Sequence, residues 1–245
     1  MSKKVALITG ITGGLGSEVA KTMALNGYSI AGQYLHQSER IAEIKSNIIA
    51  LGAEIKAYEV QLKNEDEINA FVKTVIADFG QIDALIHLAG VSQNAISWKQ
   101  EKSSWDEVIA INLTAPMLVS KAAIPVMRQQ GNGTIIYISS VVAHRPMAGT
   151  GAYAASKAGI EGLTRAQAME LVKSGITVNC IAPGYFNVGM INTIDKTQQQ
   201  QIIDAIPAGR LGNPEELAEC ILYLCSTGGK YITGQIIHNN GGLYI

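Results

Sequence analysis

The sequence predicts one α/β domain over residues 1–245, built on a doubly wound parallel sheet of seven strands with helices on both faces. Two observations favour this fold class. Short apolar runs alternate with longer helical stretches almost to the end of the chain, which is the order of elements in right-handed βαβ crossovers. The apolar runs are nearly continuous, as expected of strands that helices cover on both faces.

Each expected strand is such an apolar run, and each expected helix fills the stretch that follows it. In chain order, the strand–helix pairs are Val5–Thr9 with Leu15–Asn26, Ser29–Tyr34 with Glu39–Ala50, Glu54–Val60 with Glu65–Phe79, Ile82–Ala89 with Trp105–Gln129, Thr134–Ser139 with Tyr153–Lys173, and Thr177–Ala182 with Pro214–Ser226, before a last strand at Gln235–Asn239. We expect Pro116 and Pro125 to bend or interrupt the fourth helix, because proline lacks the amide proton that a helix needs.

One long segment lacks strand character, roughly Gly184–Leu211, and it contains the four-glutamine run Gln198–Gln201. Long segments without strands in a compact domain are more often active-site lids than plain packing. We therefore expect a substrate lid at about residues 185–211.

The composition excludes several classes of protein. The 19 basic and 20 acidic residues give a net charge of −1, which argues against nucleic acid as a partner. No apolar run approaches the ~18 residues of a membrane span and no signal peptide is recognisable, so we expect a soluble, cytoplasmic protein without a membrane partner. Only 16% of the residues are charged, against about 25% in average proteins, which favours an oligomer.

The chain has three cysteines, Cys180, Cys220 and Cys225, and no CxxC pair. Their odd number suits a reducing compartment. We expect plain core thiols and no metal site.

A glycine-rich turn follows the first strand and opens the first helix, as in a Rossmann dinucleotide site. It reads Thr9-Gly10-Ile11-Thr12-Gly13-Gly14-Leu15-Gly16. Glycines allow a tight turn and let the backbone approach a pyrophosphate, which binds to the free N–H groups of the helix N-terminus. The expected cofactor residues here are Gly10, Thr12, Gly14, Leu15 and Gly16, and an ordinary glycine-rich turn is the alternative.

The end of the second strand bears on the choice of cofactor. It reads Gln33-Tyr34-Leu35-His36-Gln37-Ser38 and has no carboxylate to bind the adenosine ribose of NAD. This favours NADP(H) slightly over NAD(H), since a carboxylate would repel the 2′-phosphate. Either His36, Ser38 or Arg40 serves that phosphate, or these are solvated residues of a loop and a first helical turn.

Tyr153 and Lys157 lie four positions apart and therefore share one helix face. An ammonium stabilises a nearby tyrosinate, so we expect Lys157 to lower the pKa of Tyr153 from ~10 towards neutrality, where a phenol can transfer the proton that accompanies hydride transfer at a carbonyl. Ser140 ends the fifth strand, at the carboxyl edge where ligands bind. Asn112, in the apolar stretch Val108–Val119, either satisfies a helix irregularity or holds a water.

Together these motifs resemble the classical short-chain dehydrogenase/reductase family over essentially the whole chain. The pattern is Thr-Gly-x-x-x-Gly-x-Gly, then Asn112, Ser140, Tyr153-Ala154-Ala155-Ser156-Lys157 and Pro183-Gly184. Within the family the chain is most similar to the 3-oxoacyl-[acyl-carrier-protein] reductases, on the segments Gly175–Asn179, Pro207–Gly212 and Tyr231–Gln235.

The resemblance implies an NAD(P)(H)-dependent oxidoreductase that interconverts a 3-oxoacyl thioester and its 3-hydroxyacyl form. It implies that Tyr153 is the general acid/base and that Lys157 tunes it and binds the nicotinamide ribose. Ser140 would hydrogen-bond the substrate oxygen, and Asn112 would anchor a proton-relay water. A homotetramer is implied as well, with Gly234–Ile245 at an interface. The remaining implied cofactor contacts are His36, Gln61, Leu62, Ala89, Gly90, Pro183, Gly184 and Val188.

Several positions depart from the family pattern. His87-Leu88-Ala89-Gly90 replaces the usual Asn-Asn-Ala-Gly, and His87 is either a substitute polar partner or, more often in such settings, a satisfied interior histidine. Gln61 stands where an Asp often meets the adenine, and Val188 stands where a Thr meets the carboxamide. Gly13 replaces the Arg of many NADP-preferring members, so the preference for NADP(H) is modest.

Carrier-protein reductases tend to have basic residues before the fifth strand and before Gly175, where this chain reads Gln129-Gln130-Gly131 and Lys173-Ser174. Because rim charges select partners, this weakens the case for acyl carrier protein and leaves a CoA thioester, or a free secondary alcohol or ketone, as competitors. A hydroxyacyl-CoA dehydrogenase is the runner-up. A non-catalytic dinucleotide-binding subunit is the alternative from another class.

Overall fold

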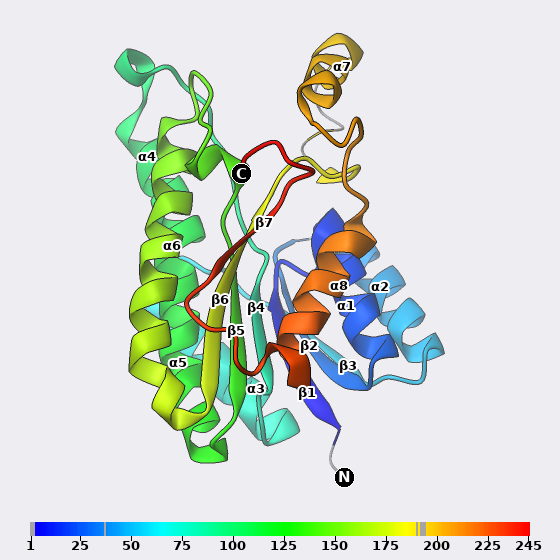
Figure 1. The fold of residues 1–245 in the computed structure, drawn as a ribbon. Coiled ribbons are helices and arrows are strands. Elements are labelled where there is room, and N and C mark those ends of the chain that lie inside the picture. Colours follow the sequence, from blue (N-terminus) through cyan, green and yellow to red (C-terminus); the bar gives the residue numbers. More distant parts are fainter. Residues whose placement is uncertain (1–2, 37, 190, 192–194) are drawn as a thin grey trace.

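Seven strands form a single parallel sheet in the order β3-β2-β1-β4-β5-β6-β7, which confirms the predicted fold class. The computed structural model describes residues 3–36, 38–189, 191 and 195–245. All strands run the same way, so their carboxyl ends lie together at the upper edge in Figure 1. The bounds are β1 Lys4–Thr9, β2 Tyr28–Tyr34, β3 Ile55–Glu59, β4 Ala84–His87, β5 Gly133–Ile138, β6 Ile176–Pro183 and β7 Ile236–Asn239.

Helices cover both faces of the sheet (Figure 1). One face packs against α1 (Gly14–Leu25), α2 (Ser38–Ala50) and α8 (Pro214–Cys225). The other face packs against α3 (Glu65–Phe79), α5 (Ala115–Gln130) and α6 (Gly151–Leu171).

Two cores result from the alternation of side chains along each strand. On the α1 face, Ile8 and Ile86 are fully buried, whereas their neighbours Leu7 and Leu85 are fully buried on the α5 face. Both faces of the central strands are therefore apolar, which explains the nearly continuous hydrophobic runs in the sequence.

Local signals fix the bounds of α3, and the prediction for this helix matches the structure. The Asn64 side chain accepts hydrogen bonds from the amides of Asp66 and Glu67 at the first turn. Gly80, with φ 77°, ends the helix in the left-handed conformation that glycine adopts readily.

The stretch predicted as one helix, Trp105–Gln129, is divided into three pieces. These are α4 (Lys102–Ile109), a turn of π-helix over Ala110–Thr114, and α5. Pro116 lies in the first turn of α5, directly after the π-helical turn, and Pro125 lies inside the helix.

The run from Lys102 to Gln130 is long and apolar enough to cross a membrane, by length and composition alone, although the sequence reading expected no such segment. Core helices of soluble proteins pass the same test. In this run Val119, Ala123 and Met127 are fully buried in the core between α5 and the sheet.

The expected lid region contains a helix that the sequence reading missed. α7 (Lys196–Ala205) begins after Asp195, whose side chain accepts hydrogen bonds from the amides of Thr197 and Gln198. It stands beyond the carboxyl ends of the strands (Figure 1). Residues 190 and 192–194 of the expected lid lie outside the described part of the chain.

Candidate active site

The glycine-rich turn joins β1 to α1 next to the point where the strand order changes direction, between β1 and β4. A Cβ atom on Gly10, which has φ 71°, would lie 2.7 Å from backbone atoms of Ala89. A Cβ atom on Gly16 would lie 2.2 Å from the carbonyl oxygen of Gly10. Both positions therefore need glycine for close backbone packing.

The amino end of α1 suits an anion. Its N-cap, Gly13, offers no side-chain hydrogen bond, and no acidic residue lies in the first turn. The first backbone N–H groups of the helix thus have no side-chain cap and no nearby protein carboxylate. This arrangement binds phosphate groups. Leu15 lies in this first turn, and Thr12 is buried in the turn itself.

Gln33 holds the turn in place, a role that the sequence reading missed. Its Oε1 accepts a hydrogen bond from the Gly10 amide at 2.9 Å, and its Nε2 donates to the Val60 carbonyl at 2.7 Å. The side chain therefore links the ends of β1, β2 and β3. A buried Gln in an otherwise apolar strand was the available signal.

The adenosine side carries an acid that the sequence reading did not place there. His36 follows β2 with φ 49°, and its Nδ1 lies 2.8 Å from Glu59 Oε1, at the end of the neighbouring strand β3. Both side chains are exposed. Gln61 and Leu62 follow β3, but the Leu62 side chain packs in the core, which leaves only its backbone for a ligand.

His87, at the end of β4, is an interior histidine with one satisfied nitrogen. Its Nε2 lies 3.0 Å from Ser120 Oγ, and its ring stacks on Tyr137 with centroids 4.9 Å apart. Burial lowers the pKa of His87 to about 3, so the ring is neutral. Its Nδ1 is buried without a hydrogen-bond partner among the described residues.

Asn112 lies in the π-helical turn and ties two segments together. Its side chain exchanges two hydrogen bonds of 2.8 Å with the backbone of Val91, and its Nδ2 also lies 3.1 Å from Ser156 Oγ on α6. Both amide protons are thus used inside the protein, which favours the structural alternative over a side chain that holds water. Gly90 packs close by, since a Cβ atom there would lie 3.3 Å from Asn112 Oδ1.

Ser140, Tyr153 and Lys157 converge at the carboxyl edge. Ser140 follows β5, and Tyr153 and Lys157 lie one turn apart on α6. The Lys157 ammonium lies 5.5 Å from the centre of the Tyr153 ring and donates to the Ile138 carbonyl at 2.7 Å. Burial lowers the pKa of Lys157 to about 8.

The expected lowering of the Tyr153 pKa is wrong for this structure. Burial raises the pKa of Tyr153 to about 12, and a hydrogen bond with Ser140 opposes the rise only in part. Desolvation disfavours the tyrosinate more than the neighbouring groups stabilise it. Tyr153 is therefore a neutral phenol at physiological pH and carries a proton to donate.

A cavity of about 270 Å³ opens at this edge. Eight of the predicted site residues line it, and the other nine do not. The eight are Leu15, Gly90, Ser140, Tyr153, Lys157, Pro183, Gly184 and Val188. The nine are Gly10, Thr12, Gly14, Gly16, His36, Gln61, Leu62, Ala89 and Asn112.

Several lining residues were not predicted individually. Ser92 and Asn94 follow β4, and Met147 and Thr150 precede α6. Tyr185 also lines the cavity, with its hydroxyl 3.7 Å from Met147 Sδ. The available signal was position, because each of these segments leaves the carboxyl end of a central strand.

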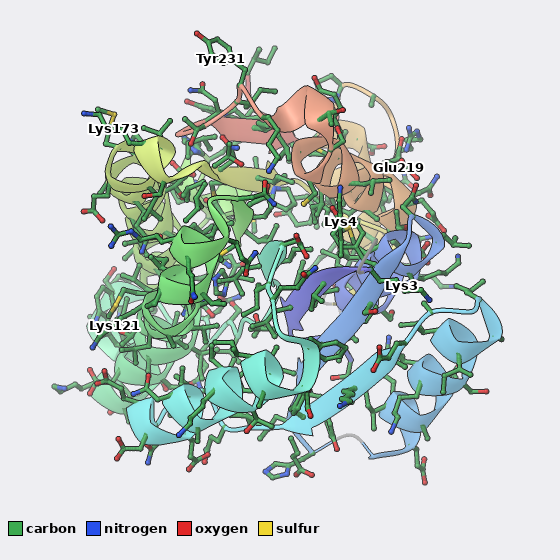
Figure 2. All side chains as sticks on the ribbon, turned by 90° about the horizontal axis from the view of Figure 1, so that it is seen from below. Lys3, Lys4, Lys121, Lys173, Glu219 and Tyr231 are labelled. Carbon is green, nitrogen blue, oxygen red and sulfur yellow. The ribbon has the colours of Figure 1, made fainter. Side chains whose placement is uncertain are left out.

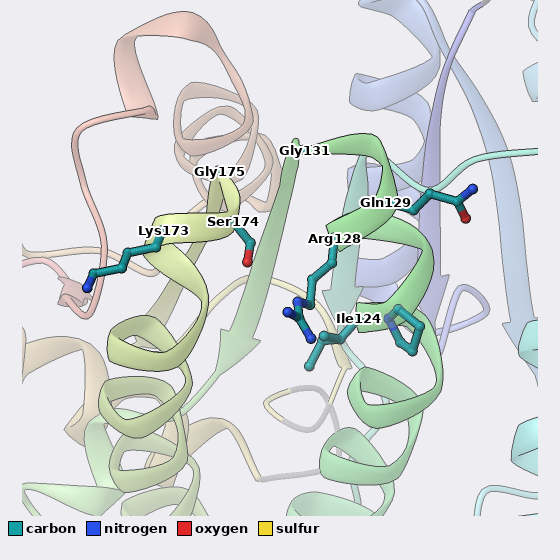
Figure 3. Close-up of a pocket in the computed structure, with 8 residues that line it drawn as sticks. Ile124, Arg128, Gln129, Gly131, Lys173, Ser174 and Gly175 are labelled. Carbon is teal, nitrogen blue, oxygen red and sulfur yellow. The ribbon is translucent and has the colours of Figure 1, made fainter.

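A second hollow of about 830 Å³ lies at the far ends of α5 and α6 (Figure 3). Arg128 points between the two helices, and Lys173 also lines the hollow, with its side chain directed away from Arg128 (Figure 3). Lys173 lies on the face at the amino ends of the strands, together with Lys3 and Lys4 (Figure 2). Arg128 adds a basic side chain next to the uncharged Gln129, which the family pattern alone did not indicate.

Among the described residues, no group of three or more His, Cys, Asp or Glu side chains could hold a metal ion. All three cysteines are free thiols, and Cys180 and Cys225 are buried.

Comparison with known proteins identifies the family. A family model described as enoyl-(acyl carrier protein) reductase matches residues 10–244. The chain is 36% identical over 242 residues to the 3-oxoacyl-[acyl-carrier-protein] reductase FabG of Staphylococcus aureus (strain Mu50), covering 99% of this chain and 98% of the relative. The chain belongs to the short-chain dehydrogenase/reductase family.

Other relatives of similar length support this assignment. The chain is 38% identical over 243 residues to nodulation protein G of Azospirillum brasilense, covering 99% of both chains. It is 35% identical over 242 residues to the FabG of Vibrio cholerae, covering 99% of this chain and 98% of the relative. As a member of the short-chain dehydrogenase/reductase family, it is an oxidoreductase that acts on CH–OH groups, and the family binds NAD(P).

Proposed function

We propose that this protein reduces a 3-oxoacyl thioester to its 3-hydroxyacyl form with NAD(P)H. The observation that carries the proposal is the convergence of Ser140, Tyr153 and Lys157 on one cavity, next to the glycine-rich turn. The relatives named above as 3-oxoacyl-[acyl-carrier-protein] reductases support the substrate class.

The residues around the turn fit a dinucleotide. The uncapped, acid-free amino end of α1 would hold the pyrophosphate, with Gly10, Gly14 and Gly16 keeping the backbone close. The cavity that contains the catalytic tyrosine is lined by Gly90, Pro183 and the other residues named above, which would contact the rest of the cofactor. When bound, the nicotinamide supplies the hydride for the substrate carbonyl carbon.

The proton comes from the protein. Tyr153 holds it at its phenolic oxygen, since burial keeps the pKa of this group at about 12. Ser140, which shares a hydrogen bond with Tyr153, orients the carbonyl oxygen that receives the proton. The Lys157 ammonium lies next to the ring and stabilises the tyrosinate left after transfer.

We propose a slight preference for NADP(H) over NAD(H). The end of β2 has no carboxylate, and His36 and Arg40 are available for a 2′-phosphate. The Glu59 carboxylate beside His36 works against this preference, which keeps it small. Measuring the Kd of NADPH and of NADH tests this preference. A lower Kd for NADH than for NADPH would overturn it.

Residues 185–211 would form the lid over the substrate. Tyr185, Phe186 and Ile191 line the cavity from this segment, and α7 lies beyond the edge of the sheet. A homotetramer and a CoA or acyl-carrier-protein thioester as substrate belong to the same proposal.

The deciding experiment mixes the purified protein with NADPH or NADH and follows the absorbance of the reduced nicotinamide. Acetoacetyl-CoA, an acetoacetyl thioester of acyl carrier protein and a free ketone are offered in turn. We expect oxidation of the cofactor with a thioester and slower oxidation with the free ketone. Cofactor binding without oxidation by any carbonyl compound would overturn the enzymatic proposal in favour of a non-catalytic dinucleotide-binding subunit.

A further inference from the structure

A buried carboxylate that the proposed reaction does not use lies one helical turn beyond Lys157. Glu161 on α6 is only 5% exposed. Its Oε1 accepts a hydrogen bond from Ser139 Oγ at 2.6 Å and lies 2.8 Å from His144 Nε2. Burying a carboxylate costs free energy unless hydrogen bonds replace those lost to water. The two partners, Ser139 and His144, supply such hydrogen bonds to Glu161.

The two partners of Glu161 flank Ser140. Ser139 directly precedes it, and His144 follows the short 3-10 turn Val141–Ala143 that Ser140 caps. One carboxylate oxygen therefore holds both ends of the segment 139–144. We call this segment the serine turn.

The same helix carries Tyr153 and Lys157, so Glu161 ties the serine turn to the element that bears the proposed proton donor. One more hydrogen bond and one further polar contact act in the same direction. Lys157 Nζ donates to the Ile138 carbonyl at 2.7 Å, and Ser139 Oγ lies 3.1 Å from the Lys157 carbonyl oxygen. The distance between Ser140 and Tyr153 thus depends on contacts made at the buried side of the serine turn.

The C-terminal part of the chain braces His144 from its other side. The His144 ring stacks on Tyr244 with centroids 4.7 Å apart, and it meets His238 edge-on at 4.8 Å. Arg145, the next residue, donates to the Leu243 carbonyl at 3.1 Å. These contacts restrict the imidazole to the orientation that reaches Glu161.

The three groups do not form a nucleophilic triad, because in such triads the imidazole lies between the hydroxyl and the acid. Here the carboxylate lies between Ser139 and His144, and no imidazole contacts the Ser139 hydroxyl among the hydrogen bonds of the described residues. The arrangement positions backbone rather than activating a nucleophile.

We propose that Glu161 is a positioning residue, whose carboxylate fixes Ser140 relative to Tyr153 by holding the serine turn at both ends. The proposal rests on the carbonyl reduction proposed above. Misplacing a catalytic group by about 1 Å can cost about 100-fold in rate, so loss of this tie should lower kcat more than it changes cofactor binding.

The test compares two substitutions at Glu161 with one control. Glu161→Ala removes the acceptor, whereas Glu161→Gln keeps an amide oxygen that can still accept both hydrogen bonds. Glu170→Gln makes the same chemical change at an exposed site on the same helix. We expect kcat to fall by about 30- to 100-fold in E161A and by less than about 5-fold in E161Q, with the Kd of NADPH within about 2-fold in both and E170Q unchanged.

A second background shows whether Glu161 acts through Ser140. In the Ser140→Ala variant no hydroxyl remains to be positioned, so adding Glu161→Ala should lower kcat by less than about 3-fold further. A loss in that background as large as in the wild type, or a parallel loss of NADPH affinity, would show a general structural role and overturn the proposal.

Amide hydrogen exchange gives a readout that does not need turnover. We expect the amides of residues 141–145 to exchange at least about 10-fold faster in E161A than in the wild type, and E170Q to match the wild type. Unchanged exchange in E161A would overturn the proposed role of Glu161, even if that variant is inactive. A wild-type protein that reduces no carbonyl compound would overturn the proposed function instead.

If E161A does not fold, His144→Phe carries the same test. It keeps a ring to stack on Tyr244 and removes the hydrogen bond to Glu161. We expect a fall in kcat of about 3- to 10-fold and faster exchange at 141–145, because one end of the serine turn is released. Wild-type kcat together with wild-type exchange in this variant would overturn the proposal.

Discussion

The phenol of Tyr153 is held neutral by burial, which raises its pKa to about 12 and suits a proton donor for carbonyl reduction. Tyr153→Phe removes only the hydroxyl. We expect turnover to fall by about 10²- to 10⁴-fold, the usual contribution of a general acid, while the Kd of NADPH stays within about 2-fold. Steady-state rates and fluorescence titration of NADPH check this, and a near-normal rate would remove Tyr153 from the proposed role.

Lys157 predicts a fall in rate at alkaline pH. Burial lowers its pKa to about 8, so the ammonium is charged below that pH and neutral above it. Since the charge stabilises the tyrosinate left after proton transfer, the reduction rate should fall above pH ~8. Lys157→Arg keeps its charge throughout this range, so any activity it retains should show no such fall. A wild-type profile that is flat from pH 7 to about 10 would contradict the role.

His87 predicts a loss of stability in acid. Its pKa is about 3 in the folded protein, against 6.5 for a free side chain. Between pH 6.5 and 3 the unfolded chain therefore binds a proton at His87 that the folded chain does not bind. The free energy of unfolding should therefore fall with decreasing pH between about 6.5 and 3, by up to about 1.4 kcal/mol per unit from this residue. His87→Asn should reduce that slope in urea unfolding measured at several pH values. An equal slope in both proteins would contradict the assignment.

At the scale of elements, the sequence predicted what local signals determine. The bounds of α3 agree because the cap at Asn64 and the glycine at Gly80 are next to the helix they limit. A helix irregularity at Asn112 was one of two alternatives offered by the sequence, and its π-helical form depends on hydrogen bonds between Asn112 and Val91, which is distant in the sequence. α7 was missed because none of its residues is fully buried and only Ile202 packs against a core cluster, which leaves no clear apolar stripe in the sequence.

The candidate site divides in the same way. Ser140 and Tyr153 line one cavity, and the sequence indicates this shared location because parallel strands end at one edge. The pairing of His36 with Glu59 depends on which strand lies beside β2, and the local sequence of neither segment determines the strand order. The Glu161 contacts were missed for the same reason, since they join α6 to a turn on another element.

The glycine-rich turn predicts a strict requirement at Gly16. An added Cβ would lie 2.2 Å from the Gly10 carbonyl oxygen, which is backbone and cannot move aside cheaply. We expect Gly16→Ala to raise the Kd of NADPH at least about 10-fold and to lower the free energy of unfolding by about 1–3 kcal/mol. Gly162→Ala is the control, since nothing lies within 4 Å of its added Cβ and helix propensity favours alanine. Wild-type affinity in G16A would show that the turn does not hold the cofactor.

At the scale of the whole molecule, the shortage of charge has a visible counterpart. Trp98 is 81% exposed, and Met169 on α6 is 80% exposed. Isolated exposed apolar residues are common, but these accompany a chain with only 16% charged residues. The homotetramer stays a prediction, which sedimentation velocity checks; a monomer at micromolar concentration would contradict it.

The hollow at the ends of α5 and α6, which Arg128 lines, bears on both the oligomeric state and the substrate. The hollow lies at the far end of α6, and this helix spans about 27 Å from Tyr153 to Leu171. A carrier protein docked there would be remote from the cavity of the same chain, so it could serve only the cavity of another copy.

Charge reversal at the hollow separates the two thioester substrates. An acidic carrier protein would be repelled by Arg128→Glu, whereas a CoA thioester has no reason to contact this end of the molecule. We expect kcat/KM for the carrier thioester to fall by about 10-fold at low salt, with less effect at high salt and a change within about 2-fold for the CoA thioester. Lys45→Glu makes a similar charge change on the exposed face of α2 and should leave both values unchanged. Equal effects on the two thioesters would mean that no carrier docks at this hollow, and a CoA thioester or a free carbonyl compound would then be the favoured substrate.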